Sequence, residues 1–454
     1  MITNLFGSAF FVILAIAVFI FLCFKNVHTG IAATVAAFIA AFGSTETLAV
    51  SMFSTFTGGV GSLVTMMFMV FTASGLFAYL MDVTGCAMSV GKTMVKTLGV
   101  DRSYLAITAT TVILLVAGVG TYTMVVVVLA IPLMKAANLP RKVGMIAALG
   151  IAPAISFCMP IANVPASLPN IFLPTTIFDA PVLSIATGCV GIVLFFFWIT
   201  RMVKKARANN EGFDGGDDVG DLDTDTSALP SFATSLIPLI VVIVSAIFMA
   251  AFKVSVPDAP APVGFFEGVL GVDSTAQVAL AQLAGCVVLI ALHFNRCKEV
   301  GFTKIVSQGA PSMWGFLVLA GCVFGFGQVV SKCAAFAPVQ EWVLGLQFSP
   351  YISAMISVAI VAGLCTDGIS AMMIWLPMFG QTYLDMGVNP GALRRLLLCT
   401  TQTFDSLPHA QSTAITLGVY GLTHKQAYWD MFVTTVIFPT IFSIFCCVCC
   451  IIFY

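Results

Sequence analysis

Apolar runs of membrane-spanning length recur along the whole chain, separated by short polar segments. A helix that crosses the hydrocarbon core of a bilayer needs about 20 mostly apolar residues. Such runs lie near residues 5–24, 30–50, 61–82 and 181–200, and again near 232–252, 276–294, 312–330 and 430–453. This pattern predicts an all-α polytopic membrane protein. No basic residue precedes the first run, so we expect a retained spanning helix there rather than a signal peptide.

Two further apolar stretches in each half are interrupted by helix-breaking or polar residues. The stretches 104–134 and 350–383 carry glycines near their middle, whereas 143–175 and 392–418 carry prolines and clustered polar residues. Non-helical backbone at membrane depth is tolerated only where protein or a water-filled cavity satisfies its polar groups. We therefore predict a re-entrant hairpin for the first stretch of each half and a helix with an unwound middle for the second.

The two halves are related in sequence at these interruptions. Val116–Pro132 (VAGVGTYTMVVVVLAIP) aligns without a gap with Val361–Pro377 (VAGLCTDGISAMMIWLP), and Ser167-Leu168-Pro169-Asn170 is echoed by Ser406-Leu407-Pro408-His409. Duplicated interruptions of this kind are typical of secondary transporters, whose binding sites form where the broken segments meet. We predict two inverted-topology repeats, residues 1–207 and 232–454, joined by a linker at 208–231. Each repeat would hold five spanning helices, one of them unwound, and one re-entrant hairpin.

Composition narrows the class further. The chain is 59% hydrophobic and 9% charged, with a net charge of −1 and a mean hydropathy of +1.06. Soluble domains carry roughly 25% charged residues, so a lipid bilayer is the expected environment. The nearly neutral charge gives no basis for nucleic-acid binding.

Basic residues indicate the orientation in the membrane. The residues that lead into the linker include Arg201, Lys204, Lys205 and Arg207, which predicts a cytoplasmic position for the linker. The inverted-repeat topology then places both termini outside the cytoplasm, with only Lys253, Lys332, Arg394 and Arg395 of the 19 Lys and Arg residues on the outer side. The aspartates that follow in the linker lack the glutamate that closes a calcium loop. They predict a disordered acidic connector.

The hairpin tips carry the first candidate binding residues. Gly118 and Gly120 permit a tight turn, after which a short helix would offer its N–H groups and the hydroxyl of Thr121 to an anion. Thr366 and Ser370 occupy the matching tip in the second half. An ordinary glycine-packed helix pair is the alternative for either segment alone, and the duplication favours a binding hairpin.

Ionisable residues in these segments are candidates for ion coupling. A carboxylate near the bilayer centre is costly and by default functional, so Asp367 is expected to carry a coupling proton or hold a cation. The alternative is that it faces a water vestibule without a role in coupling. Asp405 and His409 lie four residues apart and form a second candidate pair, because histidine titrates near physiological pH. The alternative for this pair is a structural hydrogen bond.

The unwound segments supply further polar groups. Ser167 and Asn170 in the first half, with Ser406 and His409 in the second, are predicted substrate ligands because the duplication gives them equivalent positions. Arg394 and Arg395 stand at the start of the second broken helix. They are expected either to attract an anion or to be plain interfacial charges.

Cysteine usage and catalytic motifs point to no other class. The chain has 14 cysteines, mostly in apolar runs, and no disulfide framework follows from them. Cys446, Cys447, Cys449 and Cys450 can bring several thiols to one helix face, but no histidine or carboxylate accompanies them, so we expect no metal site and no bound cofactor. No nucleophile elbow or metal-ligand cluster indicates an enzyme.

A segment near the C-terminus resembles a known transporter family. Residues 399–433 read CTTQTFDSLPHAQSTAITLGVYGLTHKQAYWDMFV and resemble the gluconate permease (gluconate:proton symporter) family of the ion transporter superfamily. That family shows a run like GGLDTLPHNGAVITLL followed by GLTHKESYKDIF. The matching positions are Asp405, Leu407-Pro408-His409, Gly421-Leu422-Thr423-His424-Lys425, Tyr428 and Asp430. Weaker similarity covers Gly75–Gly85 and Leu173–Thr176.

The resemblance implies a function. It implies proton-coupled symport of small hydroxy-carboxylates such as gluconate, with an elevator-like movement of the site and Asp405, Ser406 and His409 in that site. By analogy with elevator transporters, a homodimer in a bacterial cytoplasmic membrane is expected. Residues 365–370 and 163–170 depart from the family pattern, which leaves the substrate and the coupling ion open. The alternatives are sodium-coupled carboxylate symport and cation/proton antiport.

Overall fold

The computed structural model describes residues 5–25, 27–116, 122–215, 229–254, 263–335, 349–365, 368–408 and 410–454. These residues are almost entirely helical. Among them, strand structure is confined to the antiparallel pair β1 (Lys253–Val254) and β2 (Val263–Gly264) and one isolated bridge between Ser44 and Cys333. The predicted all-α class is therefore confirmed.

The described residues form a series of helices along the chain. Their bounds are α1 Leu5–Phe24, α2 Thr29–Ala41, α3 Leu48–Val50, α4 Thr57–Val83, α5 Cys86–Leu98, α6 Ser103–Val116, α7 Tyr122–Ala136, α8 Arg141–Leu149, α9 Val164–Ser167, α10 Pro181–Ala208, α11 Phe232–Ala251, α12 Ser274–Leu292, α13 Phe294–Val300, α14 Phe302–Gly309, α15 Trp314–Ser331, α17 Pro350–Cys365, α18 Gly368–Asp385, α19 Pro390–Thr400, α20 Gln411–Val419, α21 His424–Phe432 and α22 Phe438–Phe453. Short π-helical segments at Ser51–Phe56, Ala154–Cys158 and Val433–Ile437 extend α3 into α4, α8 toward the first break, and α21 into α22.

Seven helical stretches in the described part of the chain are long and apolar enough to cross a membrane. They are Leu48–Val83, Arg141–Cys158, Pro181–Ala208, Phe232–Ala251, Thr275–Leu292, Phe302–Ser331 and His424–Phe453. Six of the predicted apolar runs fall in these stretches, which confirms a multi-pass membrane protein. The sharply bent pair Cys86–Leu98 and Val100–Val116, with an angle of 112°, would make an eighth span if it crosses as one unit.

The predicted run at 30–50 is wrong in its boundaries. Helix α2 ends at Ala41, and a new helix begins at Leu48 and continues to Val83. The Thr47 hydroxyl caps the new start, because it accepts a hydrogen bond from the Val50 amide at 3.2 Å. An N-cap satisfies one of the amides that a helix start leaves without a partner. One polar side chain therefore starts a new helix in a stretch that hydropathy alone predicts to be a single helix.

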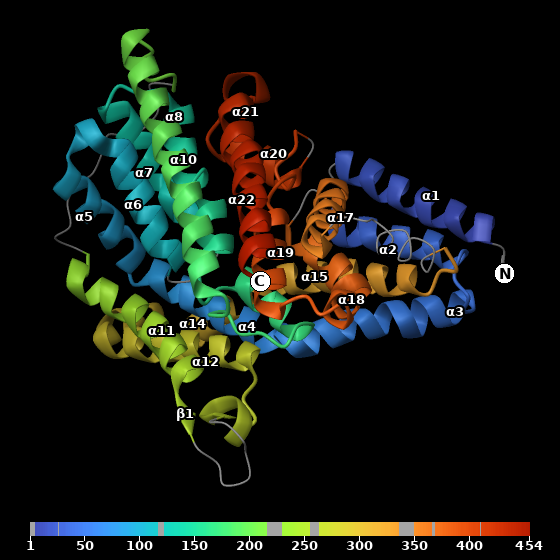
Figure 1. Ribbon diagram of the computed structural model, residues 1–454. Coiled ribbons are helices and arrows are strands. Elements are labelled where there is room, and N and C mark those ends of the chain that lie inside the picture. The colour runs from blue at the N-terminus through green and yellow to red at the C-terminus, as the bar shows by residue number, and fades with distance from the viewer. Residues whose placement is uncertain are drawn as a thin grey trace.

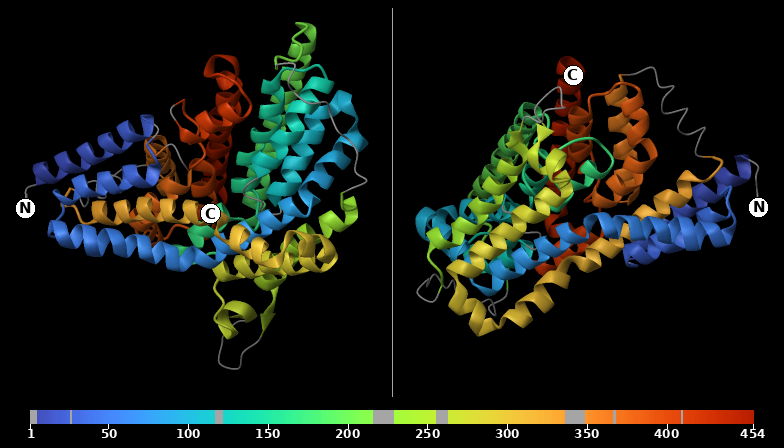
Figure 2. Two further views of the ribbon diagram at one scale, coloured as in Figure 1. Left: turned by 180° about the vertical axis from the view of Figure 1, so that it is seen from behind. Right: turned by 90° about the horizontal axis from the view of Figure 1, so that it is seen from below.

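The helices form two groups that run in different directions (Figure 1). Helices α5, α6, α7, α8 and α10 stand side by side, next to α22. Helices α1, α2, α4 and α15 run across them, and α4 contacts α5 of the first group (Figure 2). In the second group, α2 turns an alanine-rich face toward α1 and α15, and Ala33, Ala36 and Ala40 are fully buried. Small residues of this kind allow close helix packing inside a membrane.

The two glycine-containing stretches are each a pair of contacting helices. Helix α6 packs against α7, and α17 packs against α18. Their lengths of 14, 15, 16 and 18 residues fall short of the about 20 residues that one spanning helix needs. The tips at 117–121 and 366–367 lie outside the described residues, and with them the predicted site residues Gly118, Gly120, Thr121, Thr366 and Asp367.

The two proline-containing stretches are broken, as predicted. The first is helical to Cys158, is non-helical at 159–163 and resumes as the short helix α9 and a 3₁₀ turn at Leu168–Ile171. The second is helical through α19, then forms turns from Thr401 to Pro408 before α20 begins at Gln411. These breaks bring main-chain polar groups into a mostly apolar region.

The first broken segment packs against α19, and a pair of thiols tests this contact. The Sγ atoms of Cys158 and Cys399 lie 3.4 Å apart, and both residues are fully buried. In a variant whose other cysteines are serine, we expect copper–phenanthroline oxidation to join the two halves through this pair. After cleavage at a protease site inserted in the linker, the halves should run as one band on a non-reducing gel and as two after reduction.

Cys158→Ser and Cys399→Ser are the matched controls and should each abolish the cross-link. Failure of the parent variant to form it, under conditions that oxidise an engineered exposed cysteine pair, would contradict the packing of α19 on the first break.

Candidate functional site

One asparagine bonds the chain on both sides of the first break. The Asn163 side chain accepts a hydrogen bond from the Ala166 amide at 2.8 Å and donates one to the Ser156 carbonyl at 2.9 Å. It therefore caps α9 and ties the unwound chain to the π-helical turn before it. Ser167, a predicted ligand, is fully buried, and its hydroxyl donates to the Val164 carbonyl at 2.7 Å.

Two arginines from α19 bond the segment that follows this break. The Arg394 guanidinium donates through Nε to Asn170 Oδ1 at 3.2 Å and through Nη2 to the Ala166 carbonyl. Arg395 donates through Nε to the Asp179 carbonyl at 2.9 Å and through Nη2 to the Ile177 carbonyl. Both arginines are fully buried. The alternative that they are plain interfacial charges is therefore wrong, because they fix the broken segment of one half to a helix of the other.

The group around these arginines is rich in donors. In the described part of the chain, Nη1 of Arg394, Nη1 of Arg395 and Nδ2 of Asn170 are buried without a hydrogen-bond partner. Asp179 interacts electrostatically with both guanidiniums, but its carboxylate already accepts bonds from the Thr176 amide at 3.0 Å and the Thr176 hydroxyl at 2.8 Å. Buried positive charge with spare donors is chemically suited to an anion.

The second break is built from hydroxyl groups and supported by α21. The Ser406 hydroxyl donates to Asp405 Oδ1, and the Tyr428 hydroxyl donates to the Ser406 carbonyl at 3.3 Å. His424 Nε2 lies 2.9 Å from the Pro408 carbonyl oxygen. The predicted site residues Asp405 and Ser406 thus contact each other, whereas His409 lies outside the described residues.

The second helix pair lies against the second break. A Cβ atom at Gly368 would stand 2.4 Å from Gln402 Nε2, and one at Gly363 would stand 3.5 Å from the Phe404 side chain. A side chain at position 368 would therefore displace the end of the Gln402 side chain. Ser370, another predicted ligand, is fully buried in the first turn of α18. The contacts among described residues do not join Ser167 or Asn170 directly to Ser406.

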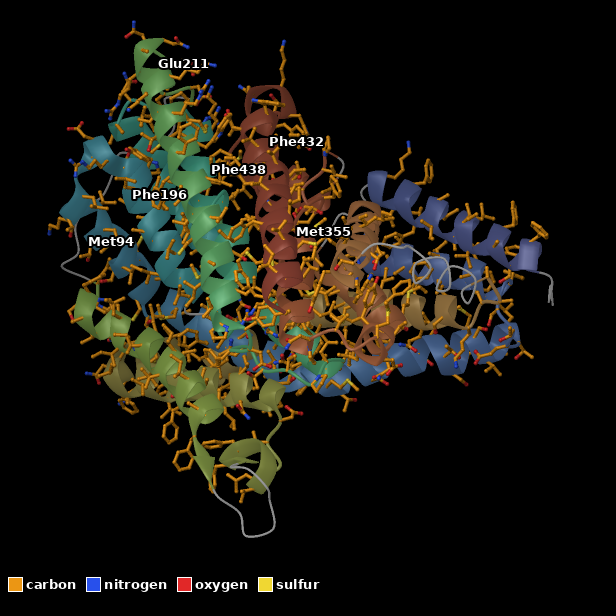
Figure 3. All side chains as sticks on the ribbon, in the orientation of Figure 1. Met94, Phe196, Glu211, Met355, Phe432 and Phe438 are labelled. Carbon is orange, nitrogen blue, oxygen red and sulfur yellow. The ribbon has the colours of Figure 1, made fainter. Side chains whose placement is uncertain are left out.

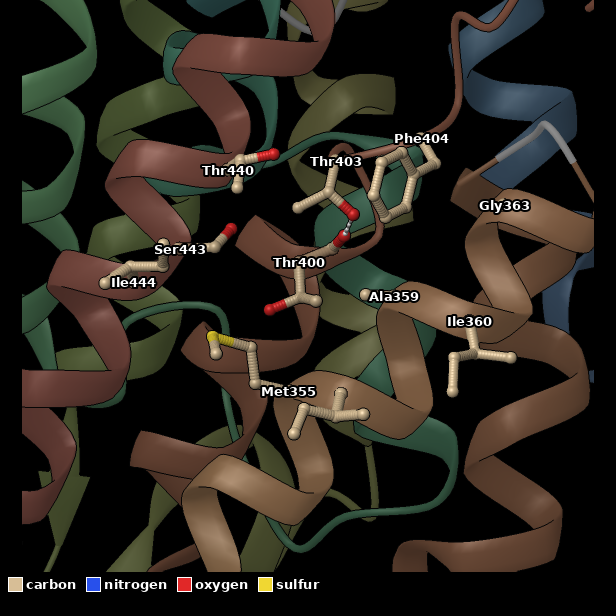
Figure 4. Close-up of a pocket in the computed structure, with 11 residues that line it drawn as sticks. Met355, Ala359, Ile360, Gly363, Thr400, Thr403, Phe404, Thr440, Ser443 and Ile444 are labelled. Carbon is tan, nitrogen blue, oxygen red and sulfur yellow. Dashed lines mark hydrogen bonds between the residues drawn. The ribbon is translucent and has the colours of Figure 1, made fainter.

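A cavity of about 510 Å³ opens between α17, the second break and α22. Its wall is mostly apolar, and its polar groups are the hydroxyls of Thr400, Thr403, Thr440 and Ser443 (Figure 4). Thr403 donates to the Thr400 carbonyl at 2.8 Å, whereas the Thr400 and Ser443 hydroxyls are buried without a partner among the described residues. Sequence reasoning missed Thr400, Thr440 and Ser443. The only local signal was two hydroxyl residues, three apart, in an otherwise apolar last helix.

The C-terminal cysteines do share a buried helix face, as their spacing predicts. Cys446, Cys447 and Cys450 are buried, whereas Cys449 is partly exposed. Cys446 lies near Cys399 from α19. Over the described ranges, no group of three or more histidine, cysteine or acidic side chains is arranged to hold a metal ion.

Comparisons with known proteins give one consistent result. A family model described as GntP family permease matches residues 8–390. The chain is 24% identical over 454 residues to the uncharacterized transporter YxjC of Bacillus subtilis, which covers 94% of this chain and 95% of that protein. It is also 24% identical over 362 residues to an uncharacterized transporter of Haemophilus influenzae, with 78% and 77% coverage.

The fold is shared with a solved transporter structure. The YdaH transporter of Alcanivorax borkumensis, described as having an unusual topology, superposes with a TM-score of 0.58 at 15% sequence identity over 88% of each chain. At this identity the likeness extends to the fold alone. The matched family residues end at 390, so the segment from Asp405 to Asp430 that carried the resemblance in sequence lies beyond them.

Proposed function

Because the chain belongs to the GntP family of permeases, and is therefore a transporter rather than an enzyme, we propose that it is a proton-coupled symporter of small organic anions. The substrates are hydroxy-carboxylates such as gluconate or related acids. The protein would work in a bacterial cytoplasmic membrane, without a bound cofactor, and would use a proton as the coupling ion.

The observation that carries this proposal is the buried arginine pair. Arg394 and Arg395 bring two positive charges into the protein interior, and both bond neutral acceptors in the segment that follows the first break. A substrate carboxylate would supply the missing negative charge and accept from the spare donors. Guanidinium groups bind carboxylates in two-point geometry. An anion would therefore draw together segments of the two halves that already meet at Asn170.

The same observation weighs against the two alternatives. Sodium coupling at the first break would need carbonyl ligands, but the Ala166, Ile177 and Asp179 carbonyls already accept from arginine. Two adjacent guanidiniums would also repel the ion. The same repulsion disfavours a cation/proton antiporter that binds its cation there. A sodium site at the second break, with its hydroxyls and exposed carbonyls, stays as the second candidate.

The architecture we propose is a pair of inverted-topology repeats, 1–207 and 232–454, joined by the linker at 208–231. The contacting pairs α6–α7 and α17–α18, and the breaks after Cys158 and Thr400, support it because they recur at matching places in the two halves. Elevator-like alternating access, extracytoplasmic termini and a homodimer belong to the same proposal.

Transport assays in inverted or right-side-out vesicles test this function. With the uptake compartment more alkaline, labelled gluconate should accumulate, a protonophore should abolish accumulation, and a sodium gradient alone should not replace the pH gradient. Ser406→Leu should reduce uptake by at least about tenfold, the equivalent of about 1.4 kcal/mol. The substitution removes the hydroxyl and its hydrogen bond to Asp405.

Ser412→Leu is the matched control, since Ser412 is exposed on α20, and it should leave uptake nearly unchanged. Accumulation driven by sodium without a pH gradient would replace the proton proposal with the sodium alternative. If labelled carboxylates of this class are not taken up under either gradient, the substrate proposal is wrong.

A further inference from the structure

A second cavity lies at the end of α10. It has a volume of about 260 Å³ and lies between α8, the end of α10, the first linker residues and α21. Three cationic side chains line it: Lys142, Arg201 and Lys205. Arg201 and Lys205 stand one helical turn apart and therefore share a face of α10. Both residues are exposed.

The acidic groups of this cavity are engaged mainly with Lys142. Glu211 Oε2 lies 3.0 Å from Lys142 Nζ. A hydrogen bond from Asn209, and then the Lys142 ammonium, lowers the pKa of the Glu211 carboxyl, so it stays ionised. Asp430, the other acidic residue of the wall, interacts more strongly with Lys142 than with Lys205. Within the described residues, neither Arg201 nor Lys205 forms an ion pair, which leaves two cations available to a ligand.

The linker wall of this cavity is ordered, although the sequence predicts a disordered connector. Asp214 accepts from the Arg141 amide at 2.8 Å and from Arg141 Nε at 3.3 Å, and the Phe213 amide donates to Asn138 Oδ1 at 3.1 Å. For residues 209–215 the prediction is therefore wrong, because specific partners on the α7–α8 connection and α8 hold them. Residues 216–228 lie outside the described ranges. The cavity has a formed wall before any ligand binds.

Below the cations, α10 presents apolar side chains to the outside. Val193 is 67% exposed and Phe197 64% exposed, and Trp429 at the cavity is 65% exposed. Figure 3 shows Glu211 at the far end of α10 and Phe196 lower on the same helix, with Phe432 and Phe438 on the adjacent α21 and α22. Exposed apolar residues followed by tryptophan and basic residues mark the rim of a bilayer. The cavity thus joins a cationic end to a lipid-facing surface.

We propose that this cavity binds the phosphodiester head group of an anionic phospholipid. Arg201 and Lys205 contact the phosphate, and the acyl chains lie along the apolar surface of α10 near Val193 and Phe197. A ligand with a charged head and an apolar body matches both parts of the site, as basic pockets between spanning helices do for anionic lipids. The lipid would bridge α10 of the first half and α21 of the second, and so stabilise their contact.

Thermal unfolding of the detergent-purified full-length protein tests this site. Phosphatidylglycerol in mixed micelles should raise the apparent unfolding temperature by about 2–4 °C over phosphatidylcholine with the same acyl chains. The double variant Arg201→Gln/Lys205→Gln should lose this difference. Lys204→Gln/Arg207→Gln removes the same charge from the same helix but does not alter the cavity wall, and it should keep the difference.

Each other outcome would overturn the proposal. An equal shift from inorganic phosphate or glycerol phosphate, without lipid, would assign the cavity to a soluble anion. Equal losses in the two double variants would show a non-specific attraction to the basic end of α10. A lipid effect that appears only after Asp217, Asp218, Asp221, Asp223 and Asp225 are replaced with asparagine would show that the acidic linker, and not lipid, occupies the site. No difference between the two lipids in the parent protein would also reject it.

Discussion

Arg394→Gln is expected to abolish carboxylate binding while changing the stability of the folded protein much less. The reason is that two opposing terms act on stability. The variant leaves the Ala166 carbonyl and Asn170 Oδ1 short of a donor, which costs about 1–3 kcal/mol for each buried group. It also removes a fully buried charge, whose desolvation costs several kcal/mol. In contrast, carboxylate binding loses the positive charge of Arg394, and no second effect of the substitution offsets this loss.

Transport should therefore fall by at least about thirtyfold, the equivalent of about 2 kcal/mol, which is the lower end of what truncating a buried charged partner costs. Initial uptake rates and the thermal shift caused by the carboxylate measure this effect, and both should be lost together. Arg394→Lys keeps the charge but loses the planar fork, so it should retain partial uptake.

Arg102→Gln is the control for the loss of a surface charge, because Arg102 is exposed and distant from Arg394 in sequence. Its uptake rate and its thermal shift should equal those of the parent protein. The contrary outcome is that Arg394→Gln unfolds at a lower temperature but still shows the full rise in unfolding temperature with carboxylate. Arg394 would then stabilise the fold without binding the anion. In that case, the anion site must lie elsewhere, with the cavity beside Thr400 and Ser443 as the next place to test.

The positions of the helix breaks could be predicted from sequence because their causes are local. Pro160 lies in the non-helical segment, and Pro165 and Pro169 lie in the two short helical turns that follow it. None of the three can donate a main-chain hydrogen bond. Proline removes such a bond wherever it stands in a helix interior. The capped start at Leu48 was missed although its cause is also local, because hydropathy outweighed a single threonine in the prediction.

The partners of the broken segments could not be predicted in the same way. Arg394 lies more than two hundred residues from Asn170 in sequence, and only the packing of α19 on the first break brings them together. Neighbouring residues of Arg394 and Arg395 are consistent with either a buried or an interfacial helix. The cavity between α17 and α22 likewise arises from three segments that are distant in sequence. Burial and charge pairing depend on tertiary contacts, which no local pattern contains.

The sequence and the residues on either side of Asp367 make it a candidate for the residue that couples transport to an ion. Gly363 and Gly368 flank this aspartate, and both lie against the second break, at Phe404 and Gln402. The matching position in the first half is Tyr122, so the carboxylate belongs to one repeat only. A charge in such a segment must be neutralised by a proton, a cation or a partner during transport.

Asp367→Asn mimics the protonated carboxylate, and we expect it to separate exchange from accumulation. One coupled proton and a pH difference of one unit supply about 1.4 kcal/mol, which is a tenfold accumulation. The parent protein should reach this ratio, whereas the variant should exchange labelled for unlabelled carboxylate across vesicles but accumulate none. If Asp367 instead holds sodium, the variant should lose sodium-dependent binding altogether. If accumulation persists with unchanged pH dependence, Asp367 is not the coupling residue. The same measurement on Asp405→Asn would then test the predicted pair of Asp405 and His409, since Asp405 already accepts the Ser406 hydroxyl.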